Sequence, residues 1–516
     1  MAMQGFLEKM LDTLDDNIQH KVKKFCITSA CCQEKNFHHL KKAFWISEKV
    51  RLTGRRQECK RSRNFQILVY SAFLSLLKAV MQMNERKLAI QGGPQSVRTD
   101  PGDLFTWPII TAEDEQAVLA VLRQGKMSGT EITKQFEQEF AAWIGAKYAL
   151  GYCNGTASLH AAMWACGVGA GDEIICPGMT YWASALPALS LGAAVNFADI
   201  EPQTLCINPE DIEHRICERT KAIVVVHYAG YPCDMDRILP IAEKHHLYVI
   251  EDVSHAHGSL YKGHKCGTIG HIGAMSMMAG KSFPAGEAGM IVTNDRRLYE
   301  RCIAFGHYER TGGPSRFNPP DNQITDPQLA QYAGVPLGGY KHRMNQTCSA
   351  MGRVQLKYYA ERMQAIQKAM NYFWDLLEDV PGIAPHRPAQ DSGSTMGGWY
   401  YPQGLYRSEE LGGLSCEQFC EAVRAEGVLQ CFPGGNDPLH LHPVFHTADI
   451  FNMGQPTMIA FGQRDVRQTR GSLPISEHIH EISFAIPWFK QFRLELIEEY
   501  AAAFRKVAEH SRQLLL

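Results

Sequence analysis

Short apolar runs of four to seven residues recur along the middle of the chain and alternate with segments of helical periodicity. Turn-forming residues bound these runs, which predicts buried strands at 148–151, 173–177, 194–197, 222–227, 247–250 and 272–278. The intervening segments place apolar residues three and four positions apart, which predicts amphipathic helices. Short strands separated by helices are typical of an α/β protein, whose mostly parallel sheet is covered by helices on both faces.

The same pattern divides the chain into three parts. Residues 1–83 show no clear period, residues 84–360 carry the alternation of strands and helices, and residues 361–516 mix short β runs with helices. We therefore predict an N-terminal extension, a large α/β domain and a smaller C-terminal α+β domain over these three ranges. The total of 516 residues exceeds what one ordinary hydrophobic core holds, which also favours more than one domain.

Charge sets the first part apart from the rest. Residues 1–83 hold 15 Lys and Arg against 7 Asp and Glu, a net charge of +8, whereas the whole chain has −2. One hypothesis makes this segment a nucleic-acid or membrane-binding appendage. The other, which we favour, makes it a disordered or non-native extension translated upstream of a start at Met81 or Met83. Its apolar run, residues 65–80, is shorter than the roughly 20 residues that cross a bilayer, and it shows no helix-turn-helix spacing.

The 16 cysteines are scattered, without a CxxC pair or a Cys/His zinc pattern. In a chain of this size, such spacing predicts reduced thiols, a cytoplasmic location and no metal site. Cys416 and Cys420 share one face of a predicted helix. Two thiols alone make a poor metal site, so we expect them to pack in the core.

Polar residues follow the ends of several predicted strands. Asn154-Gly155-Thr156 lies between a strand and a helix, where free N–H groups and a hydroxyl suit a phosphate, although such residues also serve simply as a helix cap. Tyr181 and Asp252 come just after two other strands. Ligands of parallel sheets bind at the carboxyl ends of the strands, so these residues are expected to converge on one edge. This convergence favours phosphate binding over a cap alone.

The segment 247–293 adds an acid and an isolated lysine. Asp252 ends one predicted strand, and Lys281 follows the next, with no other Lys or Arg back to Lys265. A partly desolvated lysine forms a Schiff base with an aldehyde, and a buried carboxylate keeps a pyridine nitrogen protonated. Together with the phosphate cup, these residues suit pyridoxal 5′-phosphate. Taken singly, a turn cap, a solvated loop lysine and a core tyrosine are the simpler interpretations of Asp252, Lys281 and Tyr181, but their joint placement favours the cofactor.

From about Arg86 to its C-terminus, the chain resembles the DegT/DnrJ/StrS family of sugar aminotransferases, which are fold-type I enzymes dependent on pyridoxal phosphate. The matching segments are Asn154-Gly155-Thr156, Gly169 to Pro177, Asp199-Ile200, His227 with Gly230, Glu251-Asp252 and Ser276 to Gly289. The resemblance implies a large domain with a mostly parallel sheet of the seven-stranded type between helices, plus a smaller C-terminal domain. It also implies a homodimer, with the site at the subunit interface.

The resemblance assigns roles to single residues as well. Lys281 would hold the cofactor covalently and move the proton of the substrate, and Asp252 would pair with the pyridine nitrogen. The other cofactor-binding residues would be His255 near the ring, Tyr181 stacked on it, and Gly155, Thr156 and Ser276 around the phosphate. Relatives that dehydrate deoxysugars carry His in place of this lysine, so Lys281 favours amino transfer.

The chain departs from the family pattern at a few positions. Met275 and Met277 replace two Phe residues before the lysine, and Ala288 replaces a Gly. Lys341 stands where many members have an Asn that reaches the phosphate of the partner subunit, and it would meet that anion only as a point charge. The candidates for contacting carboxylate or diphosphate groups of a substrate are Lys341, Arg310, Arg343 and His440, each of which is equally interpretable as a structural residue.

The leading hypothesis is therefore a pyridoxal-phosphate-dependent aminotransferase. It would move an amino group from glutamate or glutamine to a keto-sugar, in particular a nucleotide-linked one, or to a ketocyclitol. One alternative is a sugar dehydratase or lyase that uses the same lysine. The other is a regulatory protein that keeps pyridoxal phosphate as a ligand and binds nucleic acid through residues 1–83. We expect small-molecule substrates and a second copy of the chain as partners, without membrane or nucleic acid.

Overall fold

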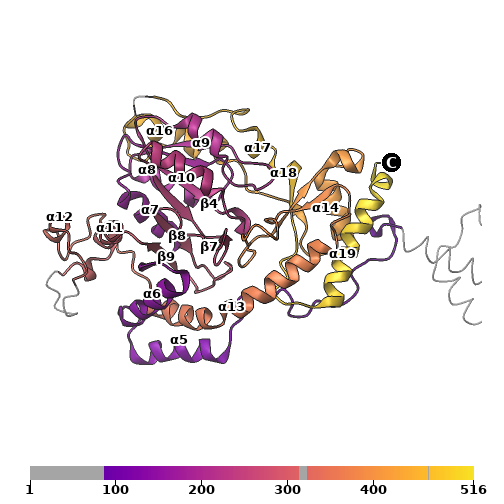
Figure 1. Cartoon of the computed structure of the whole chain (residues 1–516), viewed down its shortest axis with the longest axis horizontal. Helices are drawn as coiled ribbons and strands as arrows, with labels where there is room; N and C mark the ends of the chain where they lie inside the picture. The colour runs from indigo at the N-terminus through magenta and orange to yellow at the C-terminus, as the bar shows by residue number, and fades with distance from the viewer. Residues whose placement is uncertain (1–86, 313–321, 463, 516) are drawn as a thin grey trace, which may run out of the picture. The chain divides into compact units, whose positions relative to one another are not determined.

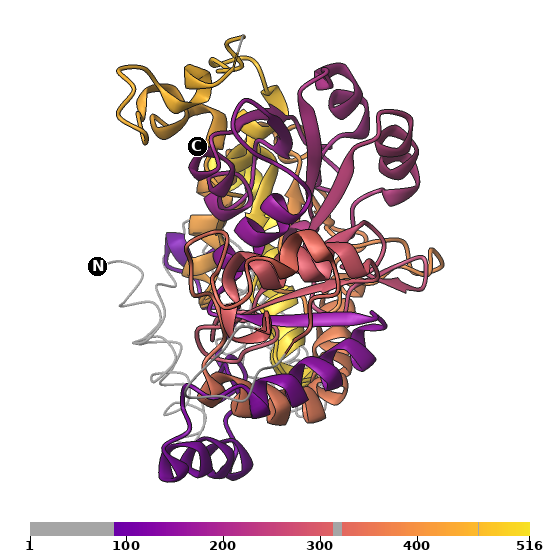
Figure 2. The same ribbon diagram turned by 90° about the vertical axis from the view of Figure 1, so that its left-hand side faces the viewer.

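The computed structural model describes residues 87–312, 322–462 and 464–515 (Figures 1 and 2). These residues belong to one compact unit, Lys87–Leu516. The extension expected over residues 1–83 lies outside the described residues. None of the helices in the described ranges is long and apolar enough to cross a membrane.

The larger of the two main sheets has seven strands in the order β1-β9-β8-β5-β4-β2-β3. These strands are β1 (Tyr148–Tyr152), β2 (Glu173–Pro177), β3 (Ala194–Ala198), β4 (Thr220–Val226), β5 (Tyr248–Asp252), β8 (Ile272–Ser276) and β9 (Gly289–Thr293). Strand β9 runs antiparallel to both of its neighbours, and the other pairs are parallel. The expected α/β class with a mostly parallel sheet is confirmed. Six strands therefore end at one edge of this sheet, which we call the rim.

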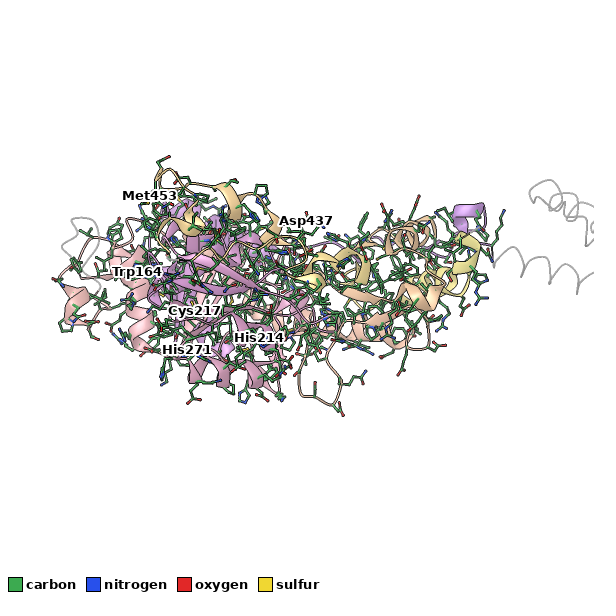
Figure 3. All side chains as sticks on the ribbon, turned by 90° about the horizontal axis from the view of Figure 1, so that it is seen from above. Trp164, His214, Cys217, His271, Asp437 and Met453 are labelled. Atoms are coloured by element: carbon green, nitrogen blue, oxygen red, sulfur yellow. The ribbon has the colours of Figure 1, made fainter. Side chains whose placement is uncertain are left out.

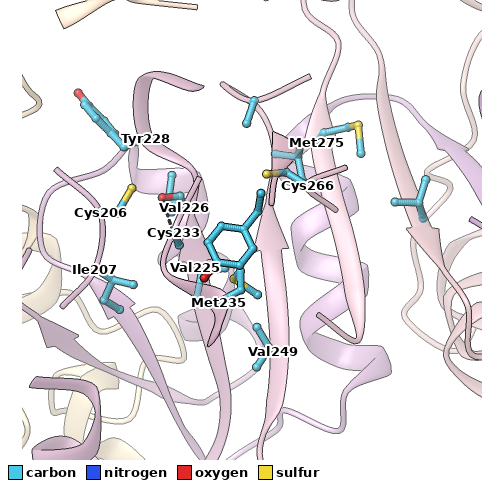
Figure 4. Packing of buried hydrophobic residues seen from close by; sticks show 14 of the residues in the cluster. Cys206, Ile207, Val225, Val226, Tyr228, Cys233, Met235, Val249, Cys266 and Met275 are labelled. Carbon is cyan, nitrogen blue, oxygen red and sulfur yellow. Dashed lines mark hydrogen bonds between the residues drawn. The ribbon is translucent and has the colours of Figure 1, made fainter. Parts of the chain in front are cut away.

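Successive side chains of each strand point to opposite faces of the sheet, so every strand contributes to two hydrophobic cores. Val225 and Val249 pack in the first core, together with Met235 (Figure 4). Their sequence neighbours Val224 and Ile250 pack in the second core. Because both faces are buried, these strands are continuous β-branched runs rather than alternating ones, which is why the sequence pattern identified them.

Helices cover the two faces of the sheet. The first core is closed by α6 (Glu131–Ile144), α9 (Pro209–Arg215) and α10 (Met235–Lys244), and the second by α7 (Gly155–Ala165), α8 (Pro187–Ser190) and α11 (Arg296–Gly306). Helix α5 (Ala112–Gln124) lies against α13 (Gln346–Asp375). Thr111 caps α5 through a capping box with Asp114.

A smaller, fully antiparallel sheet lies in the C-terminal third of the chain. Its strands are, in spatial order, β10 (Ile383–Pro385), β11 (Gln403–Tyr406), β13 (Ser483–Ala485) and β12 (Phe432–Pro433). A third core packs between this sheet, α14 (Cys416–Ala425), α19 (Leu494–Glu509) and α13. Cys416 and Cys420 are buried in it, as expected.

The chain passes between the two sheets more than once. Leu88, Val97 and Leu104 belong to the third core, so the first described residues pack with the C-terminal sheet rather than with the strands that follow them. Conversely, Met458 of helix α16 (Thr457–Ala460) packs in the second core, and this helix contacts β3 of the larger sheet. The exposed Met453, five residues earlier, is labelled in Figure 3. The division into domains at residues 360 and 361 therefore stays a prediction.

The remaining helices and strands are short, with two to four residues each. They are β6 (Leu260–Tyr261), β7 (His264–Lys265), α12 (Pro327–Ala330), α15 (Val444–Thr447), α16 (Thr457–Ala460), α17 (Pro474–Glu477) and α18 (Ile479–Ile482). After Tyr181 the chain forms a 3₁₀ turn, η2 (Trp182–Ser184), and Pro187 then starts α8.

Candidate active site

The rim brings together the strand-end residues that the sequence singled out. In the sheet register, Asp252 at the end of β5 lies beside Val226 of β4 and Ala274 of β8. The last residue of β8 is Ser276, and β1 leads into the first turn of α7. Asp252 is therefore central, and the residues that follow the neighbouring strands surround it, as expected for a parallel sheet.

The carboxylates of Asp252 and its neighbour Glu251 differ in how many lone pairs remain available to accept a further hydrogen bond. Glu251 accepts three backbone N–H groups of residues 267–270 at 2.6–2.8 Å and lies 2.9 Å from Nε2 of His227, so its lone pairs are fully used. Within the described ranges, the Asp252 carboxylate accepts two hydrogen bonds, from the Ser184 hydroxyl at 2.7 Å and the Ser254 N–H at 3.0 Å. Glu251 organises a loop, whereas Asp252 keeps lone pairs for another donor.

Lys281 lies in the loop after β8, with only 9% of its surface exposed. Burial lowers the pKa of its amine to about 8, and the negative charge of nearby Asp252 limits that fall. Its Nζ atom lies 4.2 Å from the centroid of the Tyr400 ring. The loop is held from the other side by Trp107, whose indole N–H donates to the Lys281 carbonyl at 2.8 Å. A fixed amine with this pKa is partly neutral at physiological pH and therefore nucleophilic.

The first turn of α7 is pressed against the end of β8. A Cβ atom on Gly155 would lie 2.5 Å from Cβ and 2.7 Å from Cα of Ser276, so only glycine fits here. Asn154 caps the helix by accepting the Ala157 N–H at 2.8 Å. Among the described residues, no acceptor bonds the N–H of Gly155 or Thr156. The turn thus serves as a cap and also leaves two N–H donors beside Ser276 for an anion.

Two buried histidines lie next to Lys281. The backbone N–H of Ala229 donates to Nδ1 of His255 at 3.3 Å, and the His255 ring is 4.7 Å from that of Tyr400. Nδ1 of His257 lies 3.2 Å from the Ser282 hydroxyl. Burial, and then the charge of Lys281, lower the pKa of His255 well below its usual range and that of His257 to about 3. Both rings are therefore neutral at physiological pH.

Tyr181 is more exposed than the other residues of this group. Its side chain is 50% exposed, and its ring contacts that of Trp182 at 5.0 Å between centroids. It precedes η2, which carries Ser184 to Asp252. No contact with Lys281 is found within the described part of the chain, so the stacking expected of Tyr181 stays a prediction.

Two of the residues considered for substrate contacts form hydrogen bonds with buried glutamates of the protein itself. The guanidinium of Arg310 is 1% exposed and donates to both carboxylate oxygens of Glu137, at 2.7 and 3.0 Å. Nε2 of His440, equally buried, lies 2.9 Å from Glu477. Of the two interpretations left open for these residues, the structure favours the structural one, because both side chains already have buried partners. Lys341 is exposed and stays a candidate.

Sequence reasoning missed the aromatic side of the site. Tyr400 and Trp488 lie close together, with ring centroids 5.8 Å apart, and Trp488 contacts Trp107 at 5.5 Å. We call these three residues the aromatic wall. Both neighbours of Tyr400, Trp399 and Tyr401, have φ of +54°, a conformation that non-glycine residues rarely adopt and that turns Tyr400 toward Lys281. No local sequence motif identifies the three residues of the aromatic wall, because they lie far apart in sequence and only the fold brings them together.

Comparison with known proteins agrees with this geometry. Residues 108–504 match the model of the DegT/DnrJ/EryC1/StrS aminotransferase family. The chain is 32% identical over 346 residues to the spore coat polysaccharide biosynthesis protein SpsC of Bacillus subtilis, which covers 66% of this chain and 85% of that protein. It is 34% identical over 346 residues to an L-glutamine:2-deoxy-scyllo-inosose aminotransferase of Micromonospora echinospora, covering 66% and 79%.

A solved structure is similar as well. The aminotransferase from Psychrobacter cryohalolentis superposes with a TM-score of 0.67 at 30% identity, over 79% of this chain and 99% of that one. Because the match covers 79% of this chain, it includes residues of both sheets. The resemblance seen in the motifs is confirmed: the protein belongs to the DegT/DnrJ/EryC1/StrS family and is an aminotransferase whose cofactor is pyridoxal 5′-phosphate.

Proposed function

We propose that the protein transfers an amino group from glutamate or glutamine to a keto-sugar or a ketocyclitol. The observation that carries this proposal is the juxtaposition, at one rim, of a desolvated lysine amine with a carboxylate that keeps free lone pairs. The names of its relatives support the substrate class, because one acts on a glutamine and a scyllo-inosose and another belongs to polysaccharide biosynthesis.

The residues present fit pyridoxal phosphate. Lys281 offers an amine to the aldehyde, and Asp252 offers lone pairs to a protonated ring nitrogen. The free N–H groups of Gly155 and Thr156, together with the hydroxyls of Thr156 and Ser276, suit the phosphate, and the glycine keeps that cup open. When bound, the cofactor supplies an electron sink for the negative charge that develops on the substrate carbon.

Lys281 serves two purposes in this proposal. Its Nζ atom would hold the cofactor, and the same amine, when free, would accept a proton from the substrate carbon and later return one. A pKa of about 8 suits both directions of proton transfer near neutral pH. Asp252 keeps the ring nitrogen charged, and Ser184 orients its carboxylate. In this proposal His255, neutral and buried, would lie beside the ring, and Tyr181 would cover its open face.

A sugar dehydratase or lyase remains the second candidate function, because the same lysine supports other bond cleavages. The experiment that separates the two uses glutamine labelled with nitrogen-15 at its α-amino group, with a ketocyclitol or a nucleotide-linked keto-sugar as acceptor. Amino transfer predicts a labelled amino product in the mass spectrum. Loss of water from the sugar without label would overturn the proposed reaction.

We also propose a homodimer and a cytoplasmic location. Exposed apolar side chains lie in residues 332–340, namely Tyr332, Val335, Leu337 and Tyr340, which supports a partner that covers them. This segment leads into residues 341–343, where the His342 carbonyl accepts the N–H of Cys153 beside the α7 turn. Light scattering of the purified protein should give twice the chain mass, and a monomer at micromolar concentration would contradict the dimer.

A further inference from the structure

The residue directly after Lys281 belongs to a buried polar network. The hydroxyl oxygen of Ser282 lies 3.2 Å from Nδ1 of His257. The phenol of Tyr359, on helix α13, donates to the His257 carbonyl at 2.9 Å and lies 3.4 Å from the Ser282 hydroxyl. All three side chains are buried, and they come from separate parts of the chain. We call Ser282, His257 and Tyr359 the Ser282 network.

The Ser282 network keeps its protons near neutral pH. Burial raises the pKa of the Tyr359 phenol well above its usual value. Burial, and then the charge of Lys281, lower the pKa of His257 to about 3. Because neither group gains or loses a proton near neutral pH, the network is a fixed set of hydrogen bonds. Its contribution to the site is therefore to hold atoms in place.

The packing of the core does not require the Tyr359 hydroxyl. The Tyr359 ring lies in the first core, with its centroid 5.0 Å from that of Phe283 and 5.4 Å from that of Trp143. A phenylalanine would keep both ring contacts. A hydroxyl buried among such rings costs free energy unless it is hydrogen-bonded. What distinguishes tyrosine from phenylalanine here is thus the pair of contacts with His257 and Ser282.

These contacts add to others that fix the main chain at Lys281. The Lys281 N–H donates to the Met278 carbonyl at 2.8 Å, and the Lys281 carbonyl accepts the Trp107 indole N–H at the same distance. The Ser282 network then holds the next residue. Lys281 lies in a loop, and a site on a loop is placed precisely only where neighbouring side chains lock it. The network is one of these locks, and it ties the loop to helix α13.

The same network supports the residue that covers the Lys281 amine. A Cβ atom on Gly398 would lie 2.5 Å from Cβ of Ser282 and 2.8 Å from the Tyr359 hydroxyl, so this segment packs directly on the network. Two residues later, Tyr400 places its ring 4.2 Å from the Lys281 Nζ atom. The main chain below the amine and the ring above it are therefore both held against the Ser282 network.

Lys281 has two tasks in the proposed function, and this inference rests on that function. Its amine would hold the cofactor and, when free, would reach the substrate carbon to take a proton. The amine has to move while the main chain that carries it stays fixed. We propose that Tyr359 is a positioning residue for Lys281, which acts through Ser282 and the His257 carbonyl. A misplacement of about 1 Å costs about 100-fold in rate, so this role concerns the chemical step rather than substrate binding.

The test measures the donor half-reaction of the holoenzyme with L-glutamine, followed by stopped-flow visible absorbance. We expect Tyr359→Phe to lower the limiting rate about 10- to 100-fold and to leave the donor KM within about twofold of wild type. Ser282→Ala should show the same division between rate and KM. The double variant should be no slower than the slower single variant, because both changes break one network.

Tyr358→Phe is the matched control. Tyr358 precedes Tyr359 on α13, and its hydroxyl donates to Glu113 at 2.6 Å on the outer side of the helix. Its removal should leave the limiting rate within about twofold of wild type. Hydrogen exchange of the full chain without substrates, measured by mass spectrometry over residues 278–285, gives a readout independent of activity. Exchange should be at least about threefold faster in Tyr359→Phe and unchanged in Tyr358→Phe.

Three outcomes would overturn the inference: a limiting rate of Tyr359→Phe within twofold of wild type, a loss confined to the donor KM, or losses that multiply in the double variant. If Tyr359→Phe does not fold, as judged by circular dichroism, Ser282→Ala and its hydrogen exchange decide. Failure of the proposed function looks different. A wrong acceptor class leaves the donor half-reaction intact, and a wrong anchor shows as an unchanged visible band in Lys281→Ala.

Discussion

The rim and the aromatic wall each hold a buried lysine, and the two lysines differ in one neighbour. Both amines lie over an aromatic ring, and burial lowers both pKa values, to about 8 for Lys281 and to about 6 for Lys490. Only Lys281 has an acid nearby, Asp252, which counteracts part of the burial effect. One acid thus separates an amine that is largely protonated near neutral pH from one that is mostly neutral there.

The two regions are also built differently. The rim follows from the sheet, because the strand order places the ends of β4, β5 and β8 side by side and hydrogen bonds fix the side chains there. The wall is assembled from three segments around residues 107, 400 and 488, held by single indole hydrogen bonds and by unusual backbone angles. Changes at the rim should therefore affect the chemistry itself, and changes in the wall the choice of substrate.

The largest expected effect is that of Lys281→Ala. We expect amino transfer to fall by at least about 1,000-fold, since the covalent anchor and the proton carrier are lost together. The visible absorbance of the protein with added pyridoxal phosphate should disappear as well. Lys490→Met is the control, because it removes the other buried amine and should keep that band. A Lys281→Ala protein with an unchanged spectrum would disprove the assignment of the anchor.

The next largest effect is expected for Asp252→Asn. An amide does not stabilise a positive charge on the ring nitrogen, so the rate of the donor half-reaction should fall about 100-fold or more, with little change in donor KM. Stopped-flow absorbance measures both quantities. Ser184→Ala removes only the hydrogen bond that orients the carboxylate and should cost clearly less. Equal losses in the two variants would show that orientation, rather than charge, is the contribution of this carboxylate.

A glycine substitution separates cofactor binding from chemistry. In Gly155→Ala the new methyl group would lie 2.5 Å from Ser276 Cβ, so the α7 turn and the end of β8 must move apart. We expect the affinity for pyridoxal phosphate to fall at least about tenfold, measured by fluorescence titration. Gly169→Ala is the matched control, since the nearest atom to its added Cβ is 3.9 Å away. Unchanged affinity in Gly155→Ala would argue against a phosphate at this turn.

The rim could be predicted from the sequence and the wall could not, for a physical reason. Asp252, Gly155 and Ser276 sit in local patterns, at the junction of an apolar run and a turn, and parallel sheets bring such junctions together. Trp107 and Trp488 carry no such signal, because what places them is the third core, in which the first described residues pack with the C-terminal sheet. The sequence also left the role of Arg310 open, because its partner Glu137 is 173 residues away on helix α6.

The smallest expected effect is on stability, and it compares the two lysines directly. A lysine whose pKa is lowered by folding destabilises the protein, because the unfolded chain keeps a proton that the folded chain gives up. This cost is complete below the folded pKa and disappears as pH rises toward the unfolded value of 10.5.

Lys490→Met should therefore raise the Tm at pH 7, by about 2 °C or more, and the gain should shrink by pH 10. Lys281→Met should gain less, because its pKa falls only to about 8. Scanning calorimetry of both variants without donor measures the difference. Lys368→Met, which removes an exposed amine over the Phe492 ring, is the control. If Lys490→Met is less stable than wild type while Lys368→Met is unchanged, the Lys490 amine stabilises the fold, and the expected sign is wrong.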